Sequence, residues 1–244
     1  DMAVKTGKEA SFFQELMLRI MSEEDRLIQT SDICWYKIDN VLKNKPRFNF
    51  YTTTDFATST KQSADFSVIS VWAYNNNGDW LWVDGVCKRQ LMDKNIDDLF
   101  RLAQIYEPQQ VGIEVTGQQG GFIQWIQGEM MSRNIYFPLA SEGNDSKPGV
   151  RPNTNKMVRF NTVVPLFKAR KVYFPIEKKA LPILIEFMNE LSLAAISGFR
   201  SKHDDCLDTV SMLSVLKTWK PSEEGVLVRD EETGMWEMED EDLG

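Results

Sequence analysis

Residues 48–55 read Phe48-Asn49-Phe50-Tyr51-Thr52-Thr53-Thr54-Asp55, and this stretch decides the fold. Its aromatic and β-branched side chains fall into two alternating sets, which predicts a β-strand that ends at an acid. Residues 65–74 and 80–87 predict two more strands, and the turn Asn75-Asn76-Asn77-Gly78-Asp79 between them favours a hairpin. Three consecutive antiparallel strands are the simplest arrangement of this region.

The rest of the chain alternates between helical and strand patterns. The expected helices cover residues 95–106, a segment that ends at 131, and residues 156–168, 181–196 and 203–219. The expected strands cover residues 111–115, 135–139 and 171–175. This order predicts a mixed α/β sheet with helices on its faces.

Three regions differ in composition. Residues 1–46 predict a helical extension or connector, residues 47–220 the main domain, and residues 221–244 an acidic tail that is flexible or loosely attached. The chain starts with Asp1 rather than Met, so we expect it to be a fragment of a longer protein.

Charge is distributed very unevenly. The tail holds ten acids and one arginine, a net charge of −9, so residues 1–220 sum to about +1 (−8 + 9). Residues 147–179 hold nine Lys or Arg against one Glu, a net charge of +8. Such a basic segment is typical of a surface that binds a polyanion, although a solvated face would carry the same pattern.

Composition excludes several classes of chemistry. The three cysteines are scattered without CxxC spacing, which argues against zinc clusters and disulfide frameworks and favours a reducing, intracellular setting. His203 is the single histidine, and no GxxxxGK[ST] motif for ATP hydrolysis occurs. No apolar run is long enough to span a bilayer, and no signal-peptide pattern opens the chain. Any hydrolytic chemistry must therefore rely on carboxylates.

An acidic stretch, His203-Asp204-Asp205-Cys206-Leu207-Asp208, opens the last expected helix. Asp208 follows Asp205 by three residues and Asp204 by four, so the three acids share one helix face. Like charges this close destabilise the fold unless a cation lies among them, and a divalent metal is the usual cation. The alternative is an ordinary acidic helix N-terminus, capped by Ser201 and favoured by the helix dipole.

Two acids further upstream favour the metal site. Asp55 ends the first expected strand, and Glu114 interrupts a short apolar strand in which a buried acid needs a partner or a metal. A carboxylate set without nearby His or Cys suits Mg²⁺ or Mn²⁺. Two such ions can activate water and stabilise the leaving oxygen in phosphodiester hydrolysis.

Four motifs resemble one family. They are Asp55 followed by Asp65-Phe66-Ser67-Val68; Ile113-Glu114 before the Gly117/Gly120/Gly121 turn; Lys156-Met157-Val158-Arg159 before Pro165-Leu166-Phe167 and Val172-Tyr173-Phe174-Pro175; and His203-Asp204-Asp205 with Asp208. In this order, over about residues 48–218, they resemble ribonuclease-H-like, RuvC-like nucleases. Among these, the chain is most similar to the nuclease domain of the large terminase subunit of tailed bacteriophages.

The resemblance implies a metal-dependent DNA endonuclease with two Mg²⁺ or Mn²⁺ ions. By position, Asp55 would bridge both metals, Glu114 would hold the metal on the nucleophile side, and Asp204 or Asp205 would hold the other. Asp65 and Asp208 are accessory ligand positions. His203 would be a proton donor or a partner of a ligating carboxylate, or simply a residue at the helix start.

The DNA contacts implied by the resemblance are basic residues. Lys156 and Arg159 match a pair that lies near DNA in the family, although a solvated helix face would have the same residues. Lys61, Lys147 and Arg151 lie in loops beside the expected site, where they would contact phosphates without reading sequence.

The resemblance also implies the biological setting. The enzyme would cut concatemeric double-stranded DNA at the initiation and termination of packaging, in the host cell cytoplasm, while transiently docked on the procapsid. Its partners would be a packaging ATPase domain that is absent here, the portal and the small terminase subunit, and no membrane. The alternatives are a Holliday-junction resolvase or transposase-like nuclease of the same fold, and a non-catalytic nucleic-acid-binding scaffold.

Overall fold

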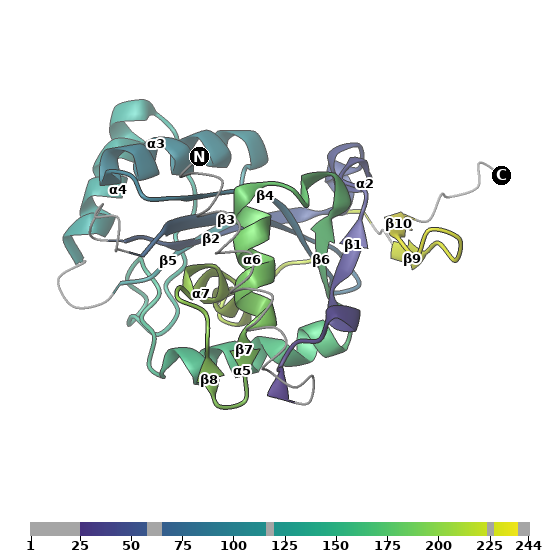
Figure 1. Cartoon of the computed structure of the whole chain (residues 1–244). Helices are drawn as coiled ribbons and strands as arrows, with labels where there is room; N and C mark the ends of the chain where they lie inside the picture. The colour runs from purple at the N-terminus through teal and green to yellow at the C-terminus, as the bar shows by residue number, and fades with distance from the viewer. Residues whose placement is uncertain (1–24, 58–64, 116–119, 224–226, 239–244) are drawn as a thin grey trace, which may run out of the picture.

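A computed structural model describes residues 25–57, 65–115, 120–223 and 227–238 of the 244-residue chain, and these form an eight-stranded sheet with helices on both faces (Figure 1). The sheet order is β5-β2-β3-β4-β6-β1-β10-β9. Its strands are β1 (Cys34–Tyr36), β2 (Asn49–Asp55), β3 (Ser67–Tyr74), β4 (Trp80–Lys88), β5 (Gln110–Ile113), β6 (Val172–Pro175), β9 (Leu227–Arg229) and β10 (Trp236–Met238). The helices are α2 (Asp39–Leu42), α3 (Met92–Tyr106), α4 (Gly120–Arg133), α5 (Lys156–Lys168), α6 (Pro182–Ser192) and α7 (Asp205–Ser211).

The centre of the sheet confirms the expected three-stranded unit. β2 pairs antiparallel with β3 from Asn49↔Tyr74 to Asp55↔Val68, and β3 pairs antiparallel with β4. Parallel strands flank this unit, β5 beside β2 and β6 beside β4. The arrangement is the expected mixed sheet, with three antiparallel strands followed by parallel ones.

Period-two alternation in the central strands builds a separate core on each face. In β3, Ile69 and Val71 belong to the core that α3 and α4 cover, whereas Val68 and Trp72 belong to the core under α5, α6 and α7. Successive side chains of a strand point to opposite faces, so a strand with both faces covered is apolar throughout. The sheet is therefore a rigid platform buried on both sides.

The N-terminal prediction of a helical segment is wrong at residues 34–36, although Asp39–Leu42 form helix α2. Residues 1–24 lie outside the described residues, but Cys34–Tyr36 form strand β1 rather than helix and pair in parallel with β6. Tyr36 is fully buried, and its hydroxyl donates a 2.8 Å hydrogen bond to the Trp82 carbonyl. A three-residue strand carries too short a pattern to outweigh helix propensity, so pairing with β6 decides its structure.

The acidic tail also differs from the prediction of a flexible segment. β9 and β10 form an antiparallel hairpin, and β10 extends the sheet by pairing with β1 at Tyr36↔Trp236. Trp236 packs against the ring of Tyr173 at 5.4 Å between centroids. The described part of the tail is thus attached to the sheet through strand pairing and an aromatic contact, which its acidic composition does not predict.

Three further expectations need correction. Residues 135–139 form no strand but make one parallel bridge, Val111↔Leu139, because Pro138 has no N–H to donate. The helix expected over residues 181–196 ends at Ser192, and Ala194–Ala195 (β7) pair with Gly198–Phe199 (β8) instead. The last expected helix is shorter than residues 203–219: α7 stops at Ser211 and a 3₁₀ turn covers Met212–Ser214.

The other described 3₁₀ turns are Thr30–Asp32, Lys45–Arg47 and Ile176–Lys178. Across the described residues, none of the helices combines the length and apolar character that crossing a bilayer requires.

Candidate active site

Acids from three elements gather at one edge of the sheet. Asp55 is the last residue of β2, and Glu114 directly follows β5, where it bridges to Val150. Because β2 and β5 are parallel neighbours, their carboxyl ends lie at the same edge. α7 packs across β2 and β3, with the hydroxyls of Thr209 and Ser70 3.3 Å apart, and brings its acids to this edge.

The start of α7 is held from two sides. Asp204 is its N-cap residue, and Asp205 and Asp208 lie in its first turn. The Asp205 carboxylate accepts a 2.8 Å hydrogen bond from the Phe66 N–H, and the Leu207 N–H donates a 3.0 Å bond to the buried Glu190 carboxyl on α6. The Leu207 N–H is one of the amides that a helix start leaves without an intrahelical partner, and the two bonds together fix the direction of the acidic face.

Two cations of α5 lie among these acids. Lys156 Nζ is 2.8 Å from Asp204 Oδ1 and 2.6 Å from Asp208 Oδ2. Arg159 Nη2 is 2.9 Å from Asp208 Oδ1 and 3.3 Å from Glu114 Oε2. The structure thus joins Glu114, Asp204 and Asp208, which are distant in sequence, into one network around Asp208.

Asp55 belongs to the same cluster by its electrostatics. Burial raises the pKa of Asp55 well above its usual value, and the charges of Asp208 and Asp205 raise it further, against an opposing effect of Lys156. Burial also raises the pKa of Glu114, although Arg159 lowers it. For Asp205, burial raises the pKa to about 6 against the Phe66 N–H, which lowers it. Burial is thus the main reason why these three carboxyls resist ionisation.

The donor set fits a divalent metal. Within the described part of the chain, the five carboxylates of Asp55, Glu114, Asp204, Asp205 and Asp208 face two cations, a net charge of −3 (−5 + 2) when all are ionised. All these donors are oxygen atoms, the ligands that Mg²⁺ and Mn²⁺ prefer. A divalent ion would stabilise the ionised form of these buried, mutually repelling carboxylates.

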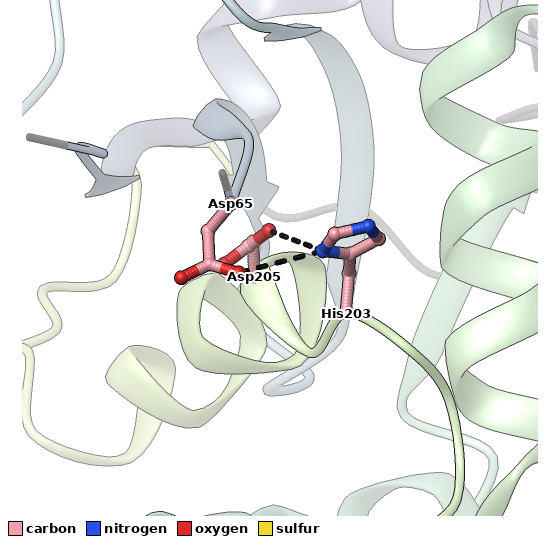
Figure 2. Close-up of side chains that lie close together, drawn as sticks. All are labelled: Asp65, His203 and Asp205. Atoms are coloured by element: carbon pink, nitrogen blue, oxygen red, sulfur yellow. Dashed lines mark hydrogen bonds and ion pairs between the residues drawn. The ribbon is translucent and has the colours of Figure 1, made fainter. Parts of the chain in front are cut away.

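A second group of side chains adjoins this cluster (Figure 2). Asp65, His203 and Asp205 each offer one atom, all within 4.8 Å of one another. His203 Nδ1 is 3.4 Å from Asp65 Oδ1, and its Nε2 is 3.1 Å from Arg89 Nη2. Because a guanidinium only donates hydrogen bonds, Nε2 is the acceptor and the proton lies on Nδ1, facing the carboxylates. In this tautomer Nδ1 donates to Asp65 and has no lone pair for a metal ion, and Asp205 Oδ2 lies 4.0 Å away.

The basic residues expected at the site have different positions. Lys61 lies outside the described residues, and Lys147 is exposed in the loop after the 135–139 segment. Arg151 lines a cavity of ≈ 280 Å³ that also contacts Glu114, Arg159 and Asp208. Lys156 and Arg159 are both paired with the acids, and the Lys156 side chain is also 47% exposed, so their proximity to DNA stays a prediction.

Two residues at the site were missed by the sequence prediction. Glu190 lies beneath α7, and a signal existed, because it continues the apolar stripe of Leu184 and Phe187 at helical spacing. Arg89 stacks on Phe66, with its guanidinium carbon 3.7 Å from the ring centroid, and holds His203. Nothing in the local sequence marks Arg89.

Residues 52–216, well over half of the chain, match the family described as the terminase RNaseH-like domain, Terminase_6C. The chain belongs to this family. The fold is accordingly ribonuclease-H-like, and the assignment favours a terminase over the resolvase and transposase-like alternatives. Among curated proteins, no sequence matches the chain.

Solved terminase nuclease structures share the fold. The human cytomegalovirus terminase nuclease domain, Mn soaked, has a TM-score of 0.56 at 13% identity, and the similarity covers 78% of this chain and 95% of that one. The same domain with an inhibitor bound has a TM-score of 0.52 at 12% identity, covering 76% and 92%. The large terminase nuclease from thermophilic phage G20c with bound cobalt has a TM-score of 0.50 at 15% identity, covering 78% and 96%.

Proposed function

We propose that this chain is a metal-dependent endodeoxyribonuclease of a viral genome-packaging terminase. It hydrolyses phosphodiester bonds of concatemeric double-stranded DNA, at the initiation and termination of packaging, with two Mg²⁺ or Mn²⁺ ions. The single observation that carries the proposal is the convergence of acids from β2, β5 and α7 around Asp208. A binding-only scaffold gives no reason to gather so many mutually repelling carboxylates.

Several facts support the metal assignment. The carboxylate cluster is oxygen-rich and carries a net negative charge, and terminase nucleases of similar fold have been solved Mn soaked and with bound cobalt. Asp55, Glu114 and Asp205 are the proposed catalytic ligands, with Asp204, Asp208 and Asp65 completing the set. When bound, two divalent ions supply an activated water and stabilise the departing oxygen.

The chain's own side chains prepare this site. Glu190 and the Phe66 N–H fix α7, which holds Asp205 and Asp208 close enough for their charges to raise the pKa of Asp55. His203, held by Arg89, donates its Nδ1 proton to Asp65 and lies 4.0 Å from Asp205. Arg159 anchors Asp208 to Glu114 and joins the acids of two elements.

DNA reaches this edge over a basic surface. Arg151 lines the cavity beside Glu114, and Lys147 is exposed in the loop that precedes Arg151. Phosphate contacts of this kind position a duplex without selecting a sequence. In the cell, the domain acts in the host cytoplasm with its packaging ATPase domain, the portal and the small terminase subunit.

The test is cleavage of supercoiled plasmid in Mn²⁺. Asp55→Asn and Glu114→Gln keep the shape of each side chain but remove a ligand charge, so each should reduce the cleavage rate at least about 100-fold. Asp39→Asn removes an exposed acid that pairs with Lys43 in α2, and it should cut normally. Cutting at the normal rate by either site variant would show that these carboxylates are not ligands.

A further inference from the structure

Lys156 occupies a position that the proposed metals also need. Its ammonium contacts Asp208 Oδ2 and Asp204 Oδ1, while Arg159 contacts Asp208 Oδ1. Both oxygens of Asp208, whose side chain is only 6% exposed, are therefore already paired with a cation. A divalent ion bound by Asp208 or Asp204 would have to share oxygen atoms that already pair with these side chains. The positive charge of the Lys156 ammonium would also repel it.

Arg159 and Lys156 differ in how easily each can move away from Asp208. The Arg159 side chain is 16% exposed and makes a third contact, from Nη1 to the Thr154 carbonyl at 3.4 Å. The Lys156 side chain is 47% exposed, with a flexible stem and a compact ammonium that water readily solvates. Lys156 is the cation that can move into solvent at low cost.

The charges indicate why Lys156 is held there at all. Its ammonium lies 2.6 Å from Asp208 Oδ2 and 2.8 Å from Asp204 Oδ1, so a single positive charge faces two carboxylates. Asp208 is buried, and removing one partner of a buried charge is strongly destabilising. The ammonium therefore compensates Asp208 whenever no metal does.

We propose that Lys156 is a built-in counter-ion that competes with divalent metal for Asp204 and Asp208. In the metal-free protein it stabilises the acidic cluster, and a bound metal displaces its ammonium from these carboxylates. The competition weakens metal affinity and keeps α7 in place before loading. This inference rests on the proposed function, because it takes the acidic cluster to be the metal site.

The first measurement is Mn²⁺ binding by titration calorimetry on the full 244-residue chain without DNA. Lys156→Gln removes the competing charge and should lower the dissociation constant about tenfold or more. Lys168→Gln is the matched control, because Lys168 lies on the same helix, is 44% exposed and pairs with Asp32. This control should change the dissociation constant by less than about twofold, since a distant surface charge is screened.

The second measurement is the melting temperature in EDTA and in saturating Mn²⁺. Lys156→Gln should melt below the unchanged chain in EDTA, where Asp208 loses a partner, and the gap should close in Mn²⁺. Should Lys156→Gln require metal to fold, recovery to the unchanged chain's melting temperature in Mn²⁺ would support the same conclusion. An equal gap under both conditions would overturn the proposal, because Lys156 would then remain paired beside the metal.

The outcomes separate this inference from the proposed function. Tighter Mn²⁺ binding by Lys156→Gln but not by Lys168→Gln supports the competition. If the unchanged chain binds Mn²⁺ and cuts plasmid while Lys156→Gln binds no more tightly, only the competition is wrong. If the unchanged chain neither binds Mn²⁺ nor cuts, the proposed function and the inference both fail.

Discussion

Glu190 is a buried acid whose protonation should make the stability of this protein depend on pH. Its side chain is fully buried on α6, with Oε2 accepting the Leu207 N–H, and Oε1 is buried without a hydrogen-bond partner among the described residues. Burial raises the pKa of Glu190 to about 9, although the Leu207 N–H lowers it. The folded protein therefore holds a proton there at neutral pH.

The size and sign of the effect follow from this shift. A pKa raised on folding gives stability that is fully present below the unfolded value of 4.5 and is lost as pH rises toward about 9. Within that window, each rise of one pH unit lowers the free energy of unfolding by about 1.4 kcal/mol. At pH 7 the loss spans 2.5 units (7 − 4.5), or about 3 kcal/mol. Glutamine carries no charge and still accepts the Leu207 N–H, so Glu190→Gln should remove this loss.

The assay is urea unfolding at pH 5, 6, 7 and 8 in EDTA. The free energy of unfolding of Glu190→Gln should exceed that of the unchanged chain by an amount that grows about 1.4 kcal/mol per pH unit. Glu186→Gln, on the same helix but only half-buried, is the control and should show no such growth. A difference that stays constant from pH 5 to 8 would refute the reasoning, because the Glu190 carboxyl would then be ionised in the folded protein.

Two further predictions test packing. A Cβ on Gly85 would lie 2.4 Å from the Ile69 carbonyl oxygen of the neighbouring strand, so Gly85→Ala should cost about 1–3 kcal/mol in thermal unfolding. Gly128→Ala meets nothing within 4 Å on helix α4 and should be neutral or slightly stabilising; equal effects of the two would contradict this. Deleting residues 221–244 removes β9 and β10, so the melting temperature should fall. Plasmid cleavage below that temperature should persist or increase, because the acids of the tail no longer compete with DNA for the basic surface. An unchanged melting temperature would show that the β1–β10 pairing contributes nothing to stability.

The sequence by itself determined the parts of this protein whose signals are local. Alternation and turn residues over residues 48–87 predicted β2, β3 and β4, and helical spacing gave α5 its observed bounds. It also identified the acids that gather at the sheet edge. These features depend on period-two and 3.6-residue patterns and on turn chemistry, which neighbouring residues encode.

Only the tertiary structure decided which strands pair in the sheet and which charged side chains form ion pairs. β1 and β10 are strands because β6 and β1 offer them backbone partners, and no local pattern in three residues specifies that choice. The sequence shows that Lys156 and Arg159 are positively charged, but a solvated helix face would carry the same two residues. Their pairing with Asp208 arises from the packing of α5 against α7, which brings together groups 49 residues apart or more in sequence. Electrostatic energy depends on distance in space, so the counter-ions of the acidic cluster exist only once the chain has folded.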